Sequence, residues 1–203
     1  MTTFYLVRHG ETGVRNKING RTPGVHLNDE GQAQAQRMAK RFADIPIAAL
    51  YSSPLDRTMD TAQHLARQLK LPVQTAEALL EIDFGEWTGM TFDELNKDPR
   101  WQQFNSFRSG TRIPGGETML EVQRRFVNWM ETIRDQYVGK RVAAVSHGDP
   151  IRAAMTYYAG MHLDMFARLE VSLTSVHVIS LDDNHARILT MNNVGELPLP
   201  QTH

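Results

Sequence analysis

The chain of 203 residues contains no cysteine. Disulfides, thiolate metal sites and a cysteine nucleophile are therefore excluded. No apolar stretch approaches the ~20 residues of a membrane-spanning helix, and the N-terminus lacks a charged segment followed by an apolar one, as in a signal peptide. We expect a soluble, cytoplasmic protein with no membrane partner.

An excess of charge of one sign is also missing. The chain has 22 Lys and Arg against 23 Asp and Glu, which gives a net charge of −1 with histidine neutral. This balance gives no reason to expect nucleic acid as a partner, because nucleic-acid binding needs a basic surface. Monomer and homodimer both stay open.

No repeat, low-complexity segment or linker divides the sequence, so we expect a single domain over residues 1–203. Runs of β-prone residues predict strands at 4–7, 47–53, 71–79, 141–146, 174–181 and 186–192. Segments with helical periodicity lie between several of these strands. This alternation predicts an α/β fold, a three-layer sandwich whose mostly parallel, mixed central sheet is flanked by helices.

Residues that favour the first turn of a helix mark four helix starts. The expected cap and starter residues are Asn28, Ser53 with Pro54, Thr118 with Glu121, and Asp149 with Pro150. Residues 82–116 have no clear periodicity, and we expect them to be irregular.

Cations and histidines follow three of the predicted strands. Arg8 and His9 come directly after the first strand, Arg57 lies in the first turn after the second, and His147 follows strand 141–146. Ligands in open α/β sheets bind beyond the carboxyl ends of the strands. Guanidinium groups and helix N-termini both suit tetrahedral oxyanions. The sequence therefore predicts a phosphate pocket built without a metal.

Four blocks of sequence carry a family resemblance: "LVRHGET", "SSPLDRTMDTA", "EIDFGEWTG" and "VSHGDPIR". In this order and spacing they resemble the histidine phosphatase superfamily, the phosphoglycerate mutase-like group. The resemblance covers most of the chain and weakens between about residues 96 and 114 and after 180. An RHG tripeptide alone arises often by chance, whereas four blocks at predicted strand ends or loops are a strong signal. The resemblance implies a phosphoglycerate mutase-like fold.

The resemblance also implies catalytic roles. His9 would attack phosphorus and form a phosphohistidine that water later hydrolyses. Arg8, Arg57 and His147 would hold the phosphoryl oxygens and offset their charge in the transition state. Glu81 matches the residue that donates a proton to the leaving oxygen. Neither a metal nor a cofactor is implied.

Further pocket residues are expected around this centre. Members of the family often have an asparagine in the loop after the RHG block, where it contacts phosphate. Asn16 is the nearest match, one place out of alignment, and Asn19 competes with it. The other expected contacts are the backbone N–H of Gly148, the side chain of Arg21 near the pocket mouth unless it faces solvent, and Glu11 and Thr12.

Three functions are compatible with this pattern. The leading one is a metal-independent phosphomonoesterase that acts on small phosphate esters. The second is a mutase that moves a phosphoryl group between positions of one sugar-acid phosphate. The third is a non-catalytic phospho-ligand binder, which the presence of both His9 and Glu81 disfavours.

Substrate selectivity in this superfamily comes from a variable insert, here about residues 96–116. Three arginines stand there beside aromatic residues, and they could clamp a second acidic group of the substrate. The alternative is an ordinary lid with a hydrophobic underside. The residues concerned are Arg100, Arg108, Arg112, Trp101, Phe104 and Phe107.

Overall fold

The computed structural model describes residues 1–199, so the last four residues of the expected domain lie outside it. Over the described residues, six strands form a sheet in the order β3-β2-β4-β1-β5-β6. β3, β2, β4 and β1 pair in parallel, β5 pairs antiparallel with β1, and β6 pairs antiparallel with β5. The predicted mixed, mostly parallel sheet is confirmed. The strands are β1 Thr2–Arg8, β2 Ala49–Ser52, β3 Val73–Thr75, β4 Arg141–Ser146, β5 Val176–Leu181 and β6 Ala186–Asn193.

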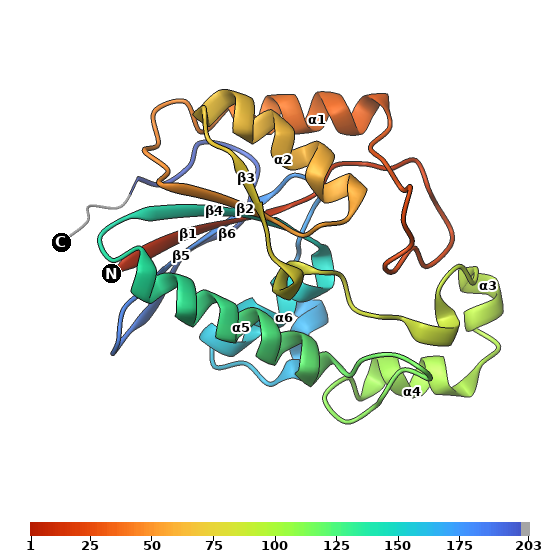
Figure 1. Ribbon diagram of the computed structural model, residues 1–203. Helices are drawn as coiled ribbons and strands as arrows, with labels where there is room; N and C mark the ends of the chain where they lie inside the picture. Colours follow the sequence, from red (N-terminus) through yellow and green to blue (C-terminus); the bar gives the residue numbers. More distant parts are fainter. Residues whose placement is uncertain (200–203) are drawn as a thin grey trace.

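Helices cover both faces of this sheet, as Figure 1 shows. Successive side chains of β1 point to opposite faces. Phe4 and Leu6 join the hydrophobic cluster under α5 and α6, and Tyr5 and Val7 join the cluster under α1 and α2. The three-layer sandwich is therefore confirmed. The helices are α1 Asp29–Lys40, α2 Asp56–Leu69, α5 Met119–Gln136 and α6 Gly148–Tyr158.

Two of the four expected helix starts are confirmed. Asn28 caps α1, and its side chain accepts a hydrogen bond from the Gly31 backbone N–H. Thr118 and Glu121 form the expected capping box at α5. In both places the expected local cap hydrogen bonds form, so local chemistry decides where the helix begins.

The expected start of α2 is wrong. The helix begins at Asp56 after the N-cap Leu55, two residues later than Ser53 and Pro54 suggest. Ser53 Oγ lies 2.9 Å from His147 Nε2 and is 3.5 Å from the Leu55 backbone nitrogen. The hydroxyl that resembles a cap is thus engaged by a histidine of the neighbouring strand end.

The expected start of α6 is also wrong. His147 is the N-cap residue and the helix begins at Gly148, so Pro150 lies inside the first turn. The Asp149 carboxylate accepts hydrogen bonds from Arg108 and Arg152 instead of capping the helix. A longer-range pairing therefore outweighs the local cap.

Residues 82–116 are not irregular as expected, since they contain α3 (Phe92–Leu95) and α4 (Pro99–Ser106). Asp98 caps α4 and Pro99 occupies its first turn, a signal present in the sequence. Figure 1 shows both helices beyond one end of the sandwich, next to the loop that follows β1. None of the helices described over residues 1–199 combines the length and apolar character needed to cross a membrane.

A separate hydrophobic cluster holds this region in place. Trp87 is completely buried, with its ring edge-on to Trp101 at 5.4 Å and to Phe104 at 5.6 Å between centroids. The same cluster includes Met119 of α5 and Phe166. The insert is therefore packed onto the body of the protein through aromatic contacts.

Candidate active site

The predicted strand-end residues meet at one cavity of about 520 Å³. Arg8, His9, Arg57 and Glu81 line it together with Gly148. Arg8 and His9 come from the end of β1, Arg57 from the helix after β2 and Gly148 from the helix after β4, as the topology requires. His147 is not among the lining residues, but its ring packs against that of His9, with the two ring centroids 5.3 Å apart.

His9 has one fixed tautomer. Its Nδ1 lies 2.7 Å from the Gly10 carbonyl oxygen, which can only accept, so Nδ1 carries the proton and Nε2 keeps its lone pair. The side chain is buried, at 9% exposure. Burial, together with the positive charges of Arg57 and Arg8, lowers the pKa of His9 to about 3. The ring is therefore neutral at physiological pH, with a nucleophilic nitrogen available.

Close backbone packing fixes the loop that carries His9. A Cβ atom on Gly10 would lie 2.7 Å from the Gly31 carbonyl oxygen, and one on Gly31 would lie 2.0 Å from the Glu11 carbonyl oxygen. Neither approach leaves room for a side chain. The Gly10 N–H also donates to Thr61 Oγ1 at 3.1 Å. The loop is thus held between α1 and α2.

Two guanidinium groups are each anchored through one nitrogen and keep another, buried nitrogen unpaired. Arg8 Nη1 donates to the Val171 carbonyl at 2.6 Å, and Arg57 Nη2 donates to the Gly20 carbonyl at 2.7 Å. The buried Arg8 Nε and Arg57 Nη1 have no hydrogen-bond partner among the described residues. Unpaired buried donors are costly, so these two are suited to an anionic ligand.

His147 provides a third donor position. The side chain is fully buried, and its Nδ1 has no hydrogen-bond partner within the described chain. When Ser53 Oγ donates to Nε2 over their 2.9 Å contact, Nδ1 carries the proton. Burial and the charge of Arg57 lower the pKa of His147 well below its ordinary value, so the ring is neutral.

Glu81 is placed to exchange a proton. Its Oε1 accepts from the Ile82 N–H at 3.0 Å, and its Oε2 lies 4.0 Å from His147 Nδ1. Burial and the negative charge of Asp149 raise the pKa of Glu81 to about 7. Both protonation states are thus populated near neutral pH, as a residue that first donates and then accepts a proton requires.

The structure separates the two candidate asparagines. Asn19 lines the cavity, whereas Asn16 is exposed, has a φ of 62° and is not among the lining residues. Glu11 and Thr12 line the cavity as expected. The loop after the RHG block is therefore placed so that Asn19, not Asn16, faces the ligand space.

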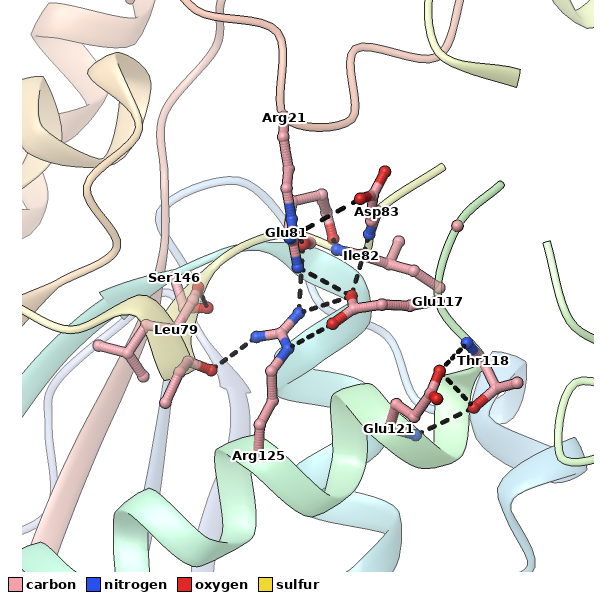
Figure 2. Close-up of polar contacts among 12 residues, drawn as sticks. Arg21, Leu79, Glu81, Ile82, Asp83, Glu117, Thr118, Glu121, Arg125 and Ser146 are labelled. Carbon is pink, nitrogen blue, oxygen red and sulfur yellow. Dashed lines mark hydrogen bonds and ion pairs between the residues drawn. The ribbon is translucent and has the colours of Figure 1, made fainter. Parts of the chain in front are cut away.

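Arg21 lies outside the cavity. Its Nε donates to the Glu81 carbonyl at 2.9 Å, and its Nη2 donates to Glu117 Oε2 at 2.9 Å. Figure 2 shows the guanidinium directed at the backbone of the segment that carries Glu81. Arg21 thus contacts the backbone of Glu81 from outside the cavity.

The arginines of the insert also lie away from the cavity. Arg108 pairs with Asp149 at 3.5 Å, and its guanidinium carbon lies 4.5 Å from the ring centroid of Phe104 and 4.2 Å from that of Phe166. These contacts hold α4 against α6. They favour the lid with a hydrophobic underside over the clamp for a second acidic group.

The other two arginines of the insert are solvent-exposed. Arg100 pairs with Asp98 at 2.8 Å, and Arg112 pairs with Glu121 at 2.6 Å. Neither lines the cavity. Phe107, expected as part of an aromatic wall, is 50% exposed.

Sequence reasoning overlooked several residues of the site, among them two charged residues of α6 and one serine. Arg152 and Asp149 line the cavity, and Ser53 contacts His147. Arg152 was recognisable, because it follows Gly148 by four residues on α6 and therefore shares its face. Ser53 precedes a proline, which is the pattern of a helix cap, so nothing in the sequence indicated its contact with His147.

The charge of the cavity comes from the chain itself. Five cationic side chains line it together with the first residue of α6; they are Arg8, Arg15, Lys17, Arg57 and Arg152. Helix N-termini carry a partial positive charge and free N–H groups. Within residues 1–199, no group of three or more His, Asp or Glu side chains is placed to hold a metal ion. The site is thus suited to bind a phosphoryl group through arginines, a histidine and backbone N–H groups.

A neutral histidine that shares a cavity with a buried and a partly buried arginine, beyond the end of a three-layer α/β sheet, defines a class of phosphate-handling proteins. The model of the histidine phosphatase superfamily (branch 1) matches residues 4–194. The chain belongs to this family, and the resemblance drawn from its four sequence blocks is confirmed.

Three similar proteins illustrate the range of the family. A bifunctional protein of Mycobacterium tuberculosis is 35% identical over 97% of this chain and 55% of its own length. Phosphoserine phosphatase 1 of Hydrogenobacter thermophilus is 30% identical over 95% of this chain and 92% of its own. The crystal structure of a phosphoserine phosphatase from Entamoeba histolytica in complex with 3-phosphoglyceric acid has a TM-score of 0.87 and 28% identity, and the match covers 98% of this chain and 100% of that one.

The chain thus spans about half the length of the first of these relatives and nearly all of the second. The structural likeness confirms the expected phosphoglycerate mutase-like fold.

Proposed function

We propose that this protein is a metal-independent phosphomonoesterase that hydrolyses small phosphorylated metabolites through a phosphohistidine on His9. The observation that carries the proposal is the neutral His9 ring, whose Nε2 lone pair is free in the cavity that Arg8 and Arg57 line. The phosphatases among its relatives support the reaction class.

In the first step the Nε2 lone pair of His9 attacks phosphorus, and the bond from phosphorus to the leaving oxygen breaks. The proton of Glu81 passes to that oxygen, so an alcohol leaves instead of an alkoxide. Arg8, Arg57 and His147 stabilise the charge that spreads over the phosphoryl oxygens. The Gly10 carbonyl accepts from Nδ1–H and supports the positive ring that results.

In the second step the Glu81 carboxylate takes a proton from water as the water oxygen attacks phosphorus. The phosphorus–nitrogen bond breaks and its electron pair returns to Nε2 of His9. Inorganic phosphate leaves, and both residues regain their starting protonation states. A pKa of Glu81 near 7 suits both proton transfers.

Trapping the intermediate tests this proposal. A substrate labelled in its phosphoryl group, quenched rapidly without acid, should leave an acid-labile and base-stable label on the protein. The His9→Ala variant should carry no label, and the control His162→Ala, at an exposed histidine, should label normally. Label that survives on His9→Ala protein would refute the assignment, and a protein that binds phosphate esters without turnover would be a binder.

A second experiment separates hydrolysis from phosphoryl transfer within one molecule. Starting from 3-phosphoglycerate, NMR should show at most slow release of phosphate, no build-up of the 2-isomer and no stimulation by 2,3-bisphosphoglycerate. A phosphohistidine open to water is hydrolysed before an intermediate can reorient. Interconversion of the isomers faster than phosphate release would make the protein a mutase.

A further inference from the structure

We propose that Glu117, with Arg21 and Arg125, positions Glu81 for proton transfer. This inference rests on the proposed function, in which Glu81 is the acid of the first step. The two arginines bind the backbone of Glu81 and Glu117 holds the arginines, and none of the three lines the cavity. They are therefore positioning residues.

Two arginines bind the same backbone oxygen. Arg21 Nε donates to the Glu81 carbonyl at 2.9 Å, and Arg125 Nη2 donates to it at 3.2 Å. Arg125 Nη1 also donates to the Ala78 carbonyl at 2.7 Å, three residues earlier. Figure 2 shows the two guanidinium groups converging on this segment from opposite sides.

The Glu117 carboxylate joins these contacts into one network. Its Oε2 accepts from Arg21 Nη2 at 2.9 Å, from Arg125 Nη2 at 3.2 Å and from the Asp83 N–H at 3.0 Å. Its Oε1 accepts from Arg125 Nε at 3.1 Å. One carboxylate thus holds both arginines and the backbone two residues beyond Glu81 (Figure 2).

The network depends on the negative charge of Glu117. Arg21 and Arg125 bring two positive charges to the same carbonyl, and the side chains of Arg125 and Glu117 are only 20% and 21% exposed. Burial lowers the pKa of Arg125, while the hydrogen bond to Glu117 raises it. Without this carboxylate the two arginines would repel each other, and Asp83, a more exposed carboxylate 3.9 Å from Arg21 Nη1, would offset only part of that repulsion.

The segment is fixed on its other side as well. Ser146 Oγ at the end of β4 donates to the Leu79 carbonyl at 2.7 Å. Together with the arginine contacts, this bond fixes the backbone on both sides of Glu81 in the sequence. The direction of its carboxyl group toward His147 therefore depends on these bonds, and a displacement of about 1 Å can cost roughly 100-fold in rate.

The test compares Glu117→Gln with Glu121→Gln. Glu121 is four residues further along the chain and also pairs with an arginine, Arg112, but it does not contact the Glu81 segment (Figure 2). The substrates are an activated aryl phosphate, whose leaving group needs little protonation, and an alkyl phosphate, whose leaving group needs a proton.

We expect Glu117→Gln to lower kcat for the alkyl phosphate by about 10- to 100-fold and kcat for the aryl phosphate by less than about threefold. The wild-type rate on the alkyl phosphate should decline above pH 7 as Glu81 ionises, and this decline should flatten in the variant. Glu121→Gln should match the wild type on both substrates. A purely structural defect would reduce both activities together.

If Glu117→Gln folds poorly, a second pair of variants tests the same proposal. Arg21→Met removes one donor to the Glu81 carbonyl at a side chain that is 31% exposed, and Arg112→Met is its control at an exposed site. Arg21→Met should show the same selective loss on the alkyl phosphate. Activity on the aryl phosphate reports whether each variant is folded.

Equal losses on both substrates in Glu117→Gln and Arg21→Met, or no loss on either, would overturn the positioning role. Both results leave the proposed function intact, because the wild type would still hydrolyse both esters. A wild-type protein inactive on both would refute the proposed function, and the positioning role would fall with it.

Discussion

Replacing Glu81 by glutamine should stabilise the protein at alkaline pH and leave its stability at acid pH almost unchanged. The glutamine amide has the shape of the protonated carboxyl group and keeps the acceptor for the Ile82 N–H. It does not ionise, and its NH2 group stands where the carboxyl group has its O–H. The comparison therefore isolates the free-energy cost of the Glu81 charge in its buried position.

The size of the effect follows from the pKa of Glu81. Burial and Asp149 raise it from the ordinary value of 4.5 to about 7. The unfolded chain therefore releases this proton at a lower pH than the folded protein does, so stability falls as pH rises from about 4.5 to about 7. Each pH unit in that interval is worth about 1.4 kcal/mol, which gives about 3 kcal/mol in total.

Urea denaturation of both proteins at pH 4.5 and pH 8 measures this difference. Glu81→Gln should unfold at nearly the wild-type urea concentration at pH 4.5, and it should be more stable by up to about 3 kcal/mol at pH 8. Glu121→Gln is the control whose effect should hardly change between pH 4.5 and pH 8, because hydrogen bonds from Arg112 and Thr118 lower the pKa of Glu121 to about 2, below that interval. A stability difference for Glu81→Gln that does not change with pH would refute the raised pKa.

Three further predictions concern turnover and the loop of His9. Glu81→Gln should slow the hydrolysis of alkyl phosphates by about 10²–10⁴-fold and that of activated aryl phosphates far less; equal losses in steady-state assays would mean that Glu81 is not the acid. Dialysis against EDTA should leave the rate unchanged, since Arg8 and Arg57 supply the positive charge; a loss restored by one divalent metal would contradict this. Gly31→Ala should destabilise the protein by about 1–3 kcal/mol in urea, because the new Cβ would overlap the Glu11 carbonyl; wild-type stability would disprove that packing constraint.

The placement of Arg8, Arg57 and His147 could be predicted because it depends on topology. A parallel strand that ends in the sheet delivers its next residue to one edge, whatever the details of the loops. Alternating apolar residues such as Phe4 and Tyr5 fix which face each strand presents. These rules need no knowledge of distant partners, and the residues they place are the ones found together at the cavity.

The helix starts at α2 and α6 could not be predicted from local chemistry. Ser53 and Asp149 have side chains typical of caps, but each is engaged by a residue far along the chain, Ser53 by His147 and Asp149 by Arg108. Such contacts form only when the sheet has brought the segments together. The α4 start is different, since Asp98 and Pro99 carried a readable local signal that was overlooked.

The contact that Arg21 makes could not be predicted from the sequence. Its position in the loop after β1 suggested a contact to substrate, and only the three-dimensional structure shows its guanidinium behind Glu81. The same burial that removes Glu81 from most of its contact with water raises its pKa, which suits the proposed role of its carboxyl group as an acid. A buried carboxyl group that must change protonation state cannot be paired directly with an arginine, because a direct ion pair would hold it ionised. The nearby arginines Arg21 and Arg125 bind its backbone carbonyl instead, which fixes the residue in place and leaves the proton on its side chain free to move.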